Sequence, residues 1–348
     1  MMYMMPMSRR AGKSARSIVH LVLASLIGLS APSAVRAQTA ALEIERTIPL
    51  KGVSGRIDHM AVDLGRKRLF VAELGNGTVD VIDIPAGAVV RRIGGFKEPQ
   101  GVGYAPGADA LAVASAGDGS VHLFRGAGLQ PTGAINLGSD ADNVRLDPRS
   151  GTFIVGYGSG GLAAIDPAKG TLVSRIPLKQ HPEAFQLDPG ERLAFVNVPD
   201  ARQIAVVDMN AGRQIRTWQM PDDVQSNFPM ALDATHDIAA IVFRSPPRLA
   251  IFDINTGKPT GTFAACGDAD DVFFDTERHR IYVSCGTGSV DVWQQEGPEY
   301  RRLSSVKTAS GARTSLFVPG LDRLYVAARA GFFGLGSDAA ILVLRPAR

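Results

Sequence analysis

The amino-acid sequence predicts an all-β protein built from repeats of one small unit. Short segments rich in Val, Ile, Phe and Tyr recur along the chain, separated by turn-forming pairs such as Asp118-Gly119 and Asp147-Pro148. No stretch keeps the periodicity of a helix long enough to compete with this pattern. The unit returns at intervals of about 40 to 46 residues, the period at which four-stranded blades repeat around a ring. Seven copies therefore predict a single seven-bladed β-propeller, with second strands at residues 68–72, 111–113, 153–155, 193–195, 238–241, 281–283 and 324–326.

Each copy is expected to hold four strands, the fourth more polar than the others. In the clearest copy, the second strand at 68–72 is followed by a Gly-Asn-Gly turn and a third strand at 79–83. The last copy ends with an apolar strand at 340–344, one strand short of a blade. The segment 42–50 resembles the fourth strand of another copy, at 172–178. We therefore expect the N-terminal strand to complete the last blade, which closes the ring and removes exposed sheet edges.

Residues 1–37 have the features of a cleavable signal peptide. Four basic residues and no acid precede an apolar run at 18–29, and Val35-Arg36-Ala37 forms a small-x-small cleavage site. The apolar run is shorter than the ~20 residues of a spanning helix, although an uncleaved membrane anchor is the alternative. The pair Arg9-Arg10 leaves twin-arginine export open beside ordinary secretion. We expect a periplasmic protein whose propeller occupies 38–348.

The basic excess of the sequence belongs to this leader. Five of the 37 Lys and Arg residues and none of the 34 acids lie within 1–37, which leaves 32 basic residues against 34 acids, a net charge of −2. A near-neutral surface without a run of Lys or Arg has no electrostatic footprint for nucleic acid. No run of about 18 apolar residues remains after leader removal, so we expect no transmembrane segment. We expect a monomer.

The chain has two cysteines, Cys266 and Cys285. In an oxidising compartment they are expected to pair, and closing this loop would stabilise the fold by roughly 3 kcal/mol. Two buried free thiols are the alternative, and a soft-metal site with the nearby aspartates ranks below the disulfide. No Cys-x-x-Cys-His motif occurs, so no c-type haem is expected.

The second and third strands are similar to a known repeat. Phe70-Val71-Ala72 and Val79-Asp80-Val81-Ile82-Asp83 resemble the Tyr-Val-x-Asn strand and the Val-x-Val-Ile-Asp strand of YVTN repeats. The chain thus resembles the YncE-like, YVTN-repeat β-propellers over essentially all of 41–346. No copy contains Tyr-Val-Thr-Asn itself, and the nearest are Phe195-Val196-Asn197 and Ile281-Tyr282-Val283-Ser284. The resemblance implies a bacterial periplasmic or secreted propeller.

Polar residues collect where the innermost strand of each blade begins. At the first aligned position of the seven copies, five residues are charged, although only 20% of the whole chain is charged. Converging carboxylates repel one another, so we expect this ring to bind a cation or to be neutralised by Arg145 or Arg313. Capping of strand ends is the alternative role. The candidate ligand-binding residues are Asp58, His59, Gln100, Asp142, Asn143, Arg145, His181, Glu183, Asn227, Asp270, Asp271 and Arg313.

Two functions from different classes fit this ring. In the first, the mouth of the channel binds a small polar ligand or a peptide of a periplasmic partner, and a ligand with both signs of charge also fits. In the second, a divalent cation of the calcium or magnesium type serves a lactonase or lyase, with His59 or His181 moving the proton. The sequence leaves catalysis open, because a fold does not by itself establish an activity.

Overall fold

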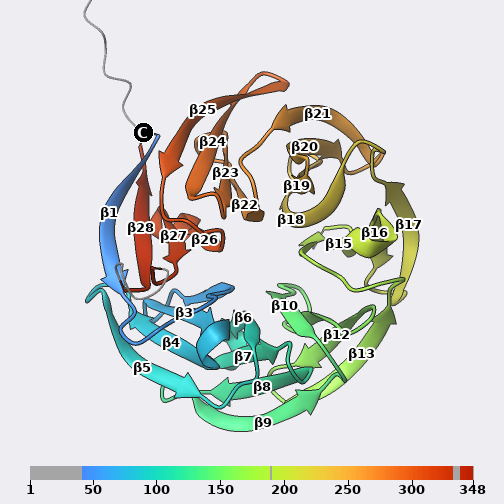
Figure 1. The fold of residues 1–348 in the computed structure, drawn as a ribbon. Coiled ribbons are helices and arrows are strands. Elements are labelled where there is room, and N and C mark those ends of the chain that lie inside the picture. Colours follow the sequence, from blue (N-terminus) through green and yellow to red (C-terminus); the bar gives the residue numbers. More distant parts are fainter. Residues whose placement is uncertain (1–40, 189, 332–337, 348) are drawn as a thin grey trace, which may run out of the picture. The chain divides into compact units, whose positions relative to one another are not determined.

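The computed structural model describes residues 41–188, 190–331 and 338–347. These residues form seven four-stranded antiparallel sheets, arranged as the blades of a ring (Figure 1). The architecture confirms the predicted seven-bladed β-propeller. The predicted leader at 1–37 lies outside the described residues.

In six blades the strands run from inner to outer in chain order, and the seventh takes the N-terminal strand as its outer strand. The first three blades are β2 (Met60–Asp63), β3 (Arg68–Glu73), β4 (Thr78–Asp83) and β5 (Ala88–Gly94); β6 (Pro99–Ala105), β7 (Ala110–Ser115), β8 (Ser120–Arg125) and β9 (Gln130–Asn136); and β10 (Ala141–Leu146), β11 (Phe153–Tyr157), β12 (Gly161–Asp166) and β13 (Thr171–Pro177). The next three are β14 (Phe185–Asp188), β15 (Leu193–Val198), β16 (Gln203–Asp208) and β17 (Arg213–Gln219); β18 (Gln225–Asp233), β19 (Ile238–Ser245), β20 (Pro247–Asp253) and β21 (Lys258–Ala264); and β22 (Ala269–Asp275), β23 (Arg280–Cys285), β24 (Ser289–Glu296) and β25 (Glu299–Lys307). The seventh blade is β26 (Ser315–Val318), β27 (Arg323–Ala328), β28 (Ala340–Pro346) and β1 (Leu42–Pro49). Short 3-10 helices lie at η1 (Leu74–Asn76), η2 (Pro106–Ala108), η3 (Pro199–Ala201) and η4 (Pro319–Leu321).

The N-terminal strand closes the ring. β1 pairs antiparallel with β28, from Leu42 opposite Pro346 to Pro49 opposite Ala340, and it forms the outer strand of the seventh blade (Figure 1). The two ends of the described chain therefore share one sheet, as the sequence predicted. Over the described ranges, no helix is long and apolar enough to span a membrane.

The hydrophobic core lies between neighbouring blades. Phe70 and Val81 of the first blade pack against Val102, Tyr104 and Leu111 of the second. All of these side chains are buried, and burying one of this size stabilises a fold by roughly 1.5–3 kcal/mol. Because sheets pack face to face around the ring, each inner strand is held on a rigid support.

Aspartates fix the far ends of the inner strands. Asp63 accepts a hydrogen bond from the backbone N–H of Arg66 at 3.0 Å, and Asp233 accepts one from Thr235 at 3.1 Å. Short polar side chains of this kind stabilise turns by bonding to the backbone a few residues on. The same turn follows other inner strands, at Asp147, Asp188 and Asp275. These turns lie at the C-terminal ends of the inner strands. The N-terminal ends of the same strands therefore lie together at the opposite end of the channel.

Candidate functional site

A polar cavity of about 200 Å³, here called the mouth cavity, lies where the inner strands begin. Its lining residues come from all seven blades or from the segments that lead into their inner strands, and most of them are charged. Of the twelve candidate residues, the mouth cavity brings together Asp58, His59, Gln100, Asp142, His181, Glu183, Asp270 and Arg313. It also contains Arg56, Asp140, Phe228 and Arg244.

Three further candidates lie away from the mouth cavity. Arg145 and Asp271 line a deeper cavity of the channel, of about 610 Å³. Asn143 is buried and lines neither cavity. From the sequence, we expected Arg145 or Arg313 to neutralise the ring of acids. Among the described residues Arg145 forms no ion pair, because its side chain points below the ring.

Asn227 is the fourth candidate that lies elsewhere. It is fully buried, and its Nδ2 donates to Oδ1 of Asn197 at 2.9 Å and to the carbonyl of Gln203 at 3.2 Å. The pairing of β18 with β19 shifts register between Asn227 and Met230, and such a bulge re-aims the side chains beside it. Asn227 therefore bonds to the neighbouring blade, and the adjacent Phe228 faces the mouth cavity.

The arginines of the mouth cavity are paired with two of its aspartates. Arg56 lies 2.7 Å from Asp58, and Nε of Arg313 lies 3.0 Å from Asp270. Arg244 also forms an ion pair with Asp270. Two of the converging carboxylates are thus neutralised by guanidinium groups of the protein itself, which is one of the two outcomes that the ring of acids predicted.

Arg244 and Phe228 form a flat wall of the mouth cavity. The guanidinium carbon of Arg244 lies 3.7 Å from the centre of the Phe228 ring, within the range of a cation–π interaction. Nε of Arg244 donates to the carbonyl of Ala269 at 2.7 Å. These contacts fix the orientation of the guanidinium group at the edge of the cavity.

Asp142 and Glu183 are two acids of the mouth cavity without an arginine partner, and Asp140 is the third. Nε2 of His59 lies 3.8 Å from Asp142 and 3.7 Å from Asp58, and Glu183 forms no ion pair in the part of the chain that the structure describes. Burial raises the pKa of Asp142 to about 8, although the nearby His59 acts in the opposite direction. Burial and the nearby Asp270 raise the pKa of Glu183 to about 7. Near neutral pH, Asp142 is therefore mostly protonated and Glu183 is protonated about half of the time.

His181 and Asp140 complete this side of the cavity. Nδ1 of His181 donates to the carbonyl of Gly158 at 2.6 Å and lies 3.4 Å from Asp140. The hydrogen bond to the backbone fixes the orientation of the imidazole ring. Asp140 therefore has an imidazole neighbour, and Glu183 has none.

The charges of the mouth cavity do not cancel. Five carboxyl groups and three guanidinium groups line it, a surplus of two carboxyls. Asp58 and Asp270 pair with arginines, and Asp140 is partly exposed to solvent beside His181, so we assign the surplus to the less exposed Asp142 and Glu183. The cavity becomes neutral when these two carboxyls keep their protons or when a cationic group enters.

A disulfide joins Cys266 and Cys285 close to the mouth cavity, with Cα atoms 5.9 Å apart. It links the segment before β22 to the end of β23. In that segment Asp268 pairs with Arg313 at 2.8 Å. The disulfide therefore helps to hold Asp268, and through it the Arg313 guanidinium, in position.

The donor geometry does not fit a resident divalent cation. Within the described ranges, no group of three His, Cys, Asp or Glu side chains is placed to hold a metal ion. Asp58 and Asp270, two of the acids that the ring would have offered to a cation, already pair with arginines. Arginine side chains of the protein thus neutralise part of the negative charge of the ring.

Besides Phe228, the mouth cavity holds three charged residues that were not among the twelve candidates: Arg56, Asp140 and Arg244. Arg56 and Asp140 stand two residues before the aligned acids Asp58 and Asp142, so a window two residues wider would have included both. Arg244 lies at the end of a second strand, whereas the aligned candidates lie at the starts of inner strands. Arg329 follows the second strand of the seventh blade in the same way. An arginine at the end of a second strand was therefore the sequence feature that could have identified Arg244.

Comparison with known proteins supports the fold and no particular function. No protein-family model and no curated protein sequence matches the chain. Among solved structures, the chain is similar to Kuenenia stuttgartiensis hydrazine synthase, with a TM-score of 0.71 and 15% identity over 83% of this chain and 95% of that one. At this identity the likeness shows the fold alone. As 1746 chains of solved structures match, the fold is too widespread to specify an activity.

Proposed function

We propose that the protein is a binding protein whose mouth cavity takes a small polar ligand, or the end of a partner peptide, through a positively charged amino group. The observation that carries the proposal is a pair of carboxyls that lack an arginine partner, the buried Asp142 and the partly buried Glu183. A buried carboxylate is stabilised strongly by a cation within hydrogen-bonding distance. An ammonium group would supply the positive charge that the surplus of two carboxyls lacks.

The arginine side of the mouth cavity favours a ligand that also carries an acid. Arg56 precedes the first blade and Arg313 the seventh, whereas Asp142 and Glu183 come from the third and fourth blades. The cavity therefore offers guanidinium groups and free carboxyls from different parts of the ring. With about 200 Å³, it is smaller than the roughly 300–1,000 Å³ of pockets for drug-sized ligands, so a compact amino acid or a peptide N-terminus fits best.

Calorimetric titration of the full chain with glycine, γ-aminobutyrate and the dipeptide glycylglycine tests this proposal. We expect at least one of them to bind, and N-acetylation of the same compound to abolish binding. Asp142→Asn and Glu183→Gln should each weaken binding roughly 10- to 100-fold, the effect of losing a hydrogen bond to a charged group. Asp222→Asn, an exposed acid outside the mouth cavity, is the matched control and should bind as the wild type does.

Two arms of the same titration separate the sources of the amino group. Binding of glycylglycine but not of glycine would identify a peptide end, and the reverse would identify a small molecule. Equal binding by the wild type and the two mouth variants would refute the proposed site. A metal-dependent lactonase or lyase is not the function that we propose, because no three-ligand group occurs among the described side chains.

We also propose that the chain is exported to the periplasm and is a YncE-like, YVTN-repeat propeller. The leader-like composition of 1–37 supports export, and the similarity of Phe70-Val71-Ala72 and 79–83 to the YVTN repeat supports the family. The propeller would then occupy 38–348 and act as a monomer. N-terminal sequencing of the protein purified from the periplasm, with its mass in solution, tests cleavage after Ala37 and the monomeric state.

A further inference from the structure

Below the mouth cavity, the channel holds a larger cavity with different chemistry, here called the channel chamber. It has a volume of about 610 Å³ and extends past the inner strands to the turns at their far ends. His59 lines both cavities, so the two adjoin at this residue. The walls of the chamber are apolar and polar in nearly equal parts, and the apolar part includes Met60, Val102, Val144, Leu146, Leu232 and Leu316. A volume of this size, with an apolar surface and a few polar groups, is typical of small-molecule sites.

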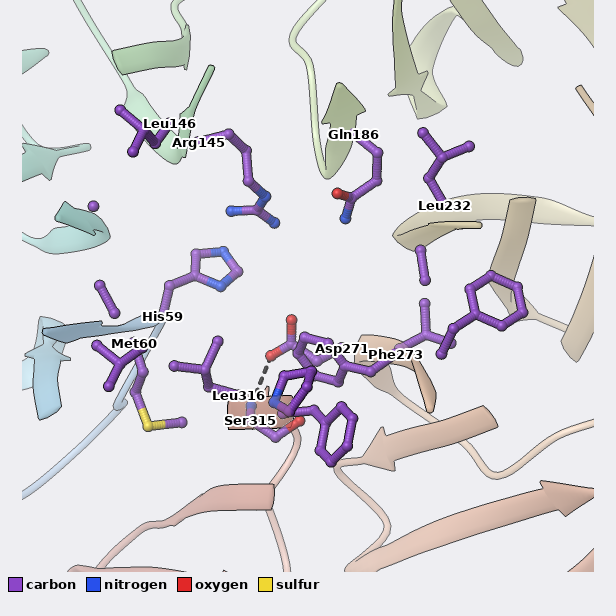
Figure 2. A pocket seen from close by; sticks show the side chains of 18 of the residues that line it. His59, Met60, Arg145, Leu146, Gln186, Leu232, Asp271, Phe273, Ser315 and Leu316 are labelled. Atoms are coloured by element: carbon purple, nitrogen blue, oxygen red, sulfur yellow. Dashed lines mark hydrogen bonds between the residues drawn. The ribbon is translucent and has the colours of Figure 1, made fainter. Parts of the chain in front are cut away.

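Arg145 supplies the chamber with a guanidinium group whose donors are largely unused. Figure 2 shows its side chain pointing into the same space as those of His59 and Gln186. Within the described residues, its one hydrogen bond runs from Nη1 to the carbonyl of Val144 at 3.0 Å, and no carboxylate lies within ion-pair distance. A guanidinium group has five N–H donors in a planar fork. Most of that fork is therefore available to a ligand.

The surroundings of Arg145 hold the fork in place without neutralising it. Its guanidinium carbon lies 5.8 Å from the centre of the buried Phe185 ring. Burial lowers the pKa of Arg145, although the nearby Asp271 and Asp142 act in the opposite direction without forming an ion pair with it. A partly buried cation of this kind is stabilised by an anion that forms two parallel hydrogen bonds with it.

The other polar groups of the chamber tolerate such an anion. Gln186 donates to the carbonyl of Met230 at 2.7 Å, which leaves its second amide N–H free to donate. Asp271 accepts the backbone N–H of Ser315 at 2.7 Å, and burial raises its pKa well above the usual range, which disfavours the charged form of this carboxyl. Burial thus weakens the repulsion that this acid would exert on an incoming anion.

We infer that the channel chamber is a second binding site, which takes an apolar monocarboxylate with its carboxylate on the Arg145 fork. One unpaired guanidinium group balances one negative charge, so a monoanion suits the chamber better than a phosphate dianion. The apolar walls would receive the alkyl or aryl body of the ligand. This site differs from the mouth cavity in the sign of its unpaired group. The channel chamber has an unpaired guanidinium group, whereas the mouth cavity has carboxyl groups without an arginine partner.

Calorimetric titration of the full chain with octanoate tests the inference. Octanoate should bind, whereas methyl octanoate and inorganic phosphate should not. Arg145→Gln should weaken octanoate binding roughly 10- to 100-fold, because it removes a charge-assisted pair of hydrogen bonds. Arg213→Gln, an exposed arginine on the outer strand β17, is the matched control and should leave binding unchanged.

A second variant guards against a folding effect of the Arg145 change. Leu232→Trp leaves Arg145 in place but fills part of the chamber, and it should also reduce octanoate binding. Circular dichroism of each variant checks that the propeller is folded. Octanoate affinity equal in the wild type and Arg145→Gln would overturn the inference, as would equal affinity for the methyl ester, or no octanoate binding by the wild type. None of these results bears on amine binding at the mouth cavity, so the two proposals fail independently.

Discussion

Glu183 links the charge of the mouth cavity to the stability of the whole fold. Burial raises its pKa from 4.5 to about 7, so the folded protein holds this proton more tightly than the unfolded chain. The stabilising contribution is complete below the unfolded pKa of 4.5 and is lost as the pH rises through about 7. A shift of this size corresponds to at most about 3 kcal/mol.

Gln at this position keeps the shape of the protonated side chain and cannot ionise. Between about pH 5 and about pH 9, the free energy of unfolding of Glu183→Gln should therefore fall less than that of the wild type, by up to about 3 kcal/mol. Urea unfolding at the two pH values, followed by the fluorescence of the buried Trp218 and Trp293, measures this difference. Asp222→Asn, which is exposed, should follow the wild type. Equal pH dependence for the wild type and Glu183→Gln would refute a raised pKa at this site.

Three other outcomes follow from the same geometry. Replacing Cys266 and Cys285 together by Ser should lower the free energy of unfolding by about 3 kcal/mol, and an unchanged urea midpoint without reductant would contradict this stabilising role. The affinity of an amine ligand should rise between about pH 6 and about pH 8, because binding needs ionised Asp142 and Glu183; pH-independent calorimetric affinity would argue against these partners. Chelation by EDTA should leave the thermal midpoint unchanged, since no three-ligand group occurs in the described ranges, and a lower midpoint would reveal a structural metal.

The fold could be predicted because the turn and strand patterns that specify it are short stretches of sequence that repeat along the chain. The Gly-Asn-Gly turn between the strands at 68–72 and 79–83 marks one hairpin, and Gly-x-Gly turns at 117–119, 158–160 and 286–288 mark others. The N-terminal strand was recognisable because 42–50 has the pattern of a fourth strand and the last blade lacked one. A closed ring of blades explains both the repeated hairpins and the pairing of the N-terminal strand with the last blade.

The site could be predicted only in part, because its contacts depend on bulges and on neighbouring blades. The alignment found Asp58, Asp142 and Glu183 since each stands at or near the start of an inner strand. It could not show that a register shift turns Asn227 into the blade. Nor could it show that Arg244, from the second strand of its blade, reaches an aspartate at the start of the next blade.

The ion pairs and protonation states of the mouth cavity were the features that the sequence predicted least. A row of acids indicates repulsion, but whether arginines, protons or a ligand relieve it depends on distances of a few ångströms. The structure pairs Arg56 with Asp58 and Arg313 with Asp270, and it leaves Asp142 and Glu183 to hold protons. It also removes Arg145 from the ring, into the channel chamber.

The titration of these two carboxyl groups tests the account most directly. In the full chain labelled with carbon-13 at the Asp and Glu carboxyls, Asp142→Asn and Glu183→Gln identify the two resonances by their loss. We expect midpoints near pH 8 for Asp142 and near pH 7 for Glu183. Midpoints at the ordinary values of about 4 for both groups would contradict the account, because the mouth cavity would then hold two permanent carboxylates at neutral pH.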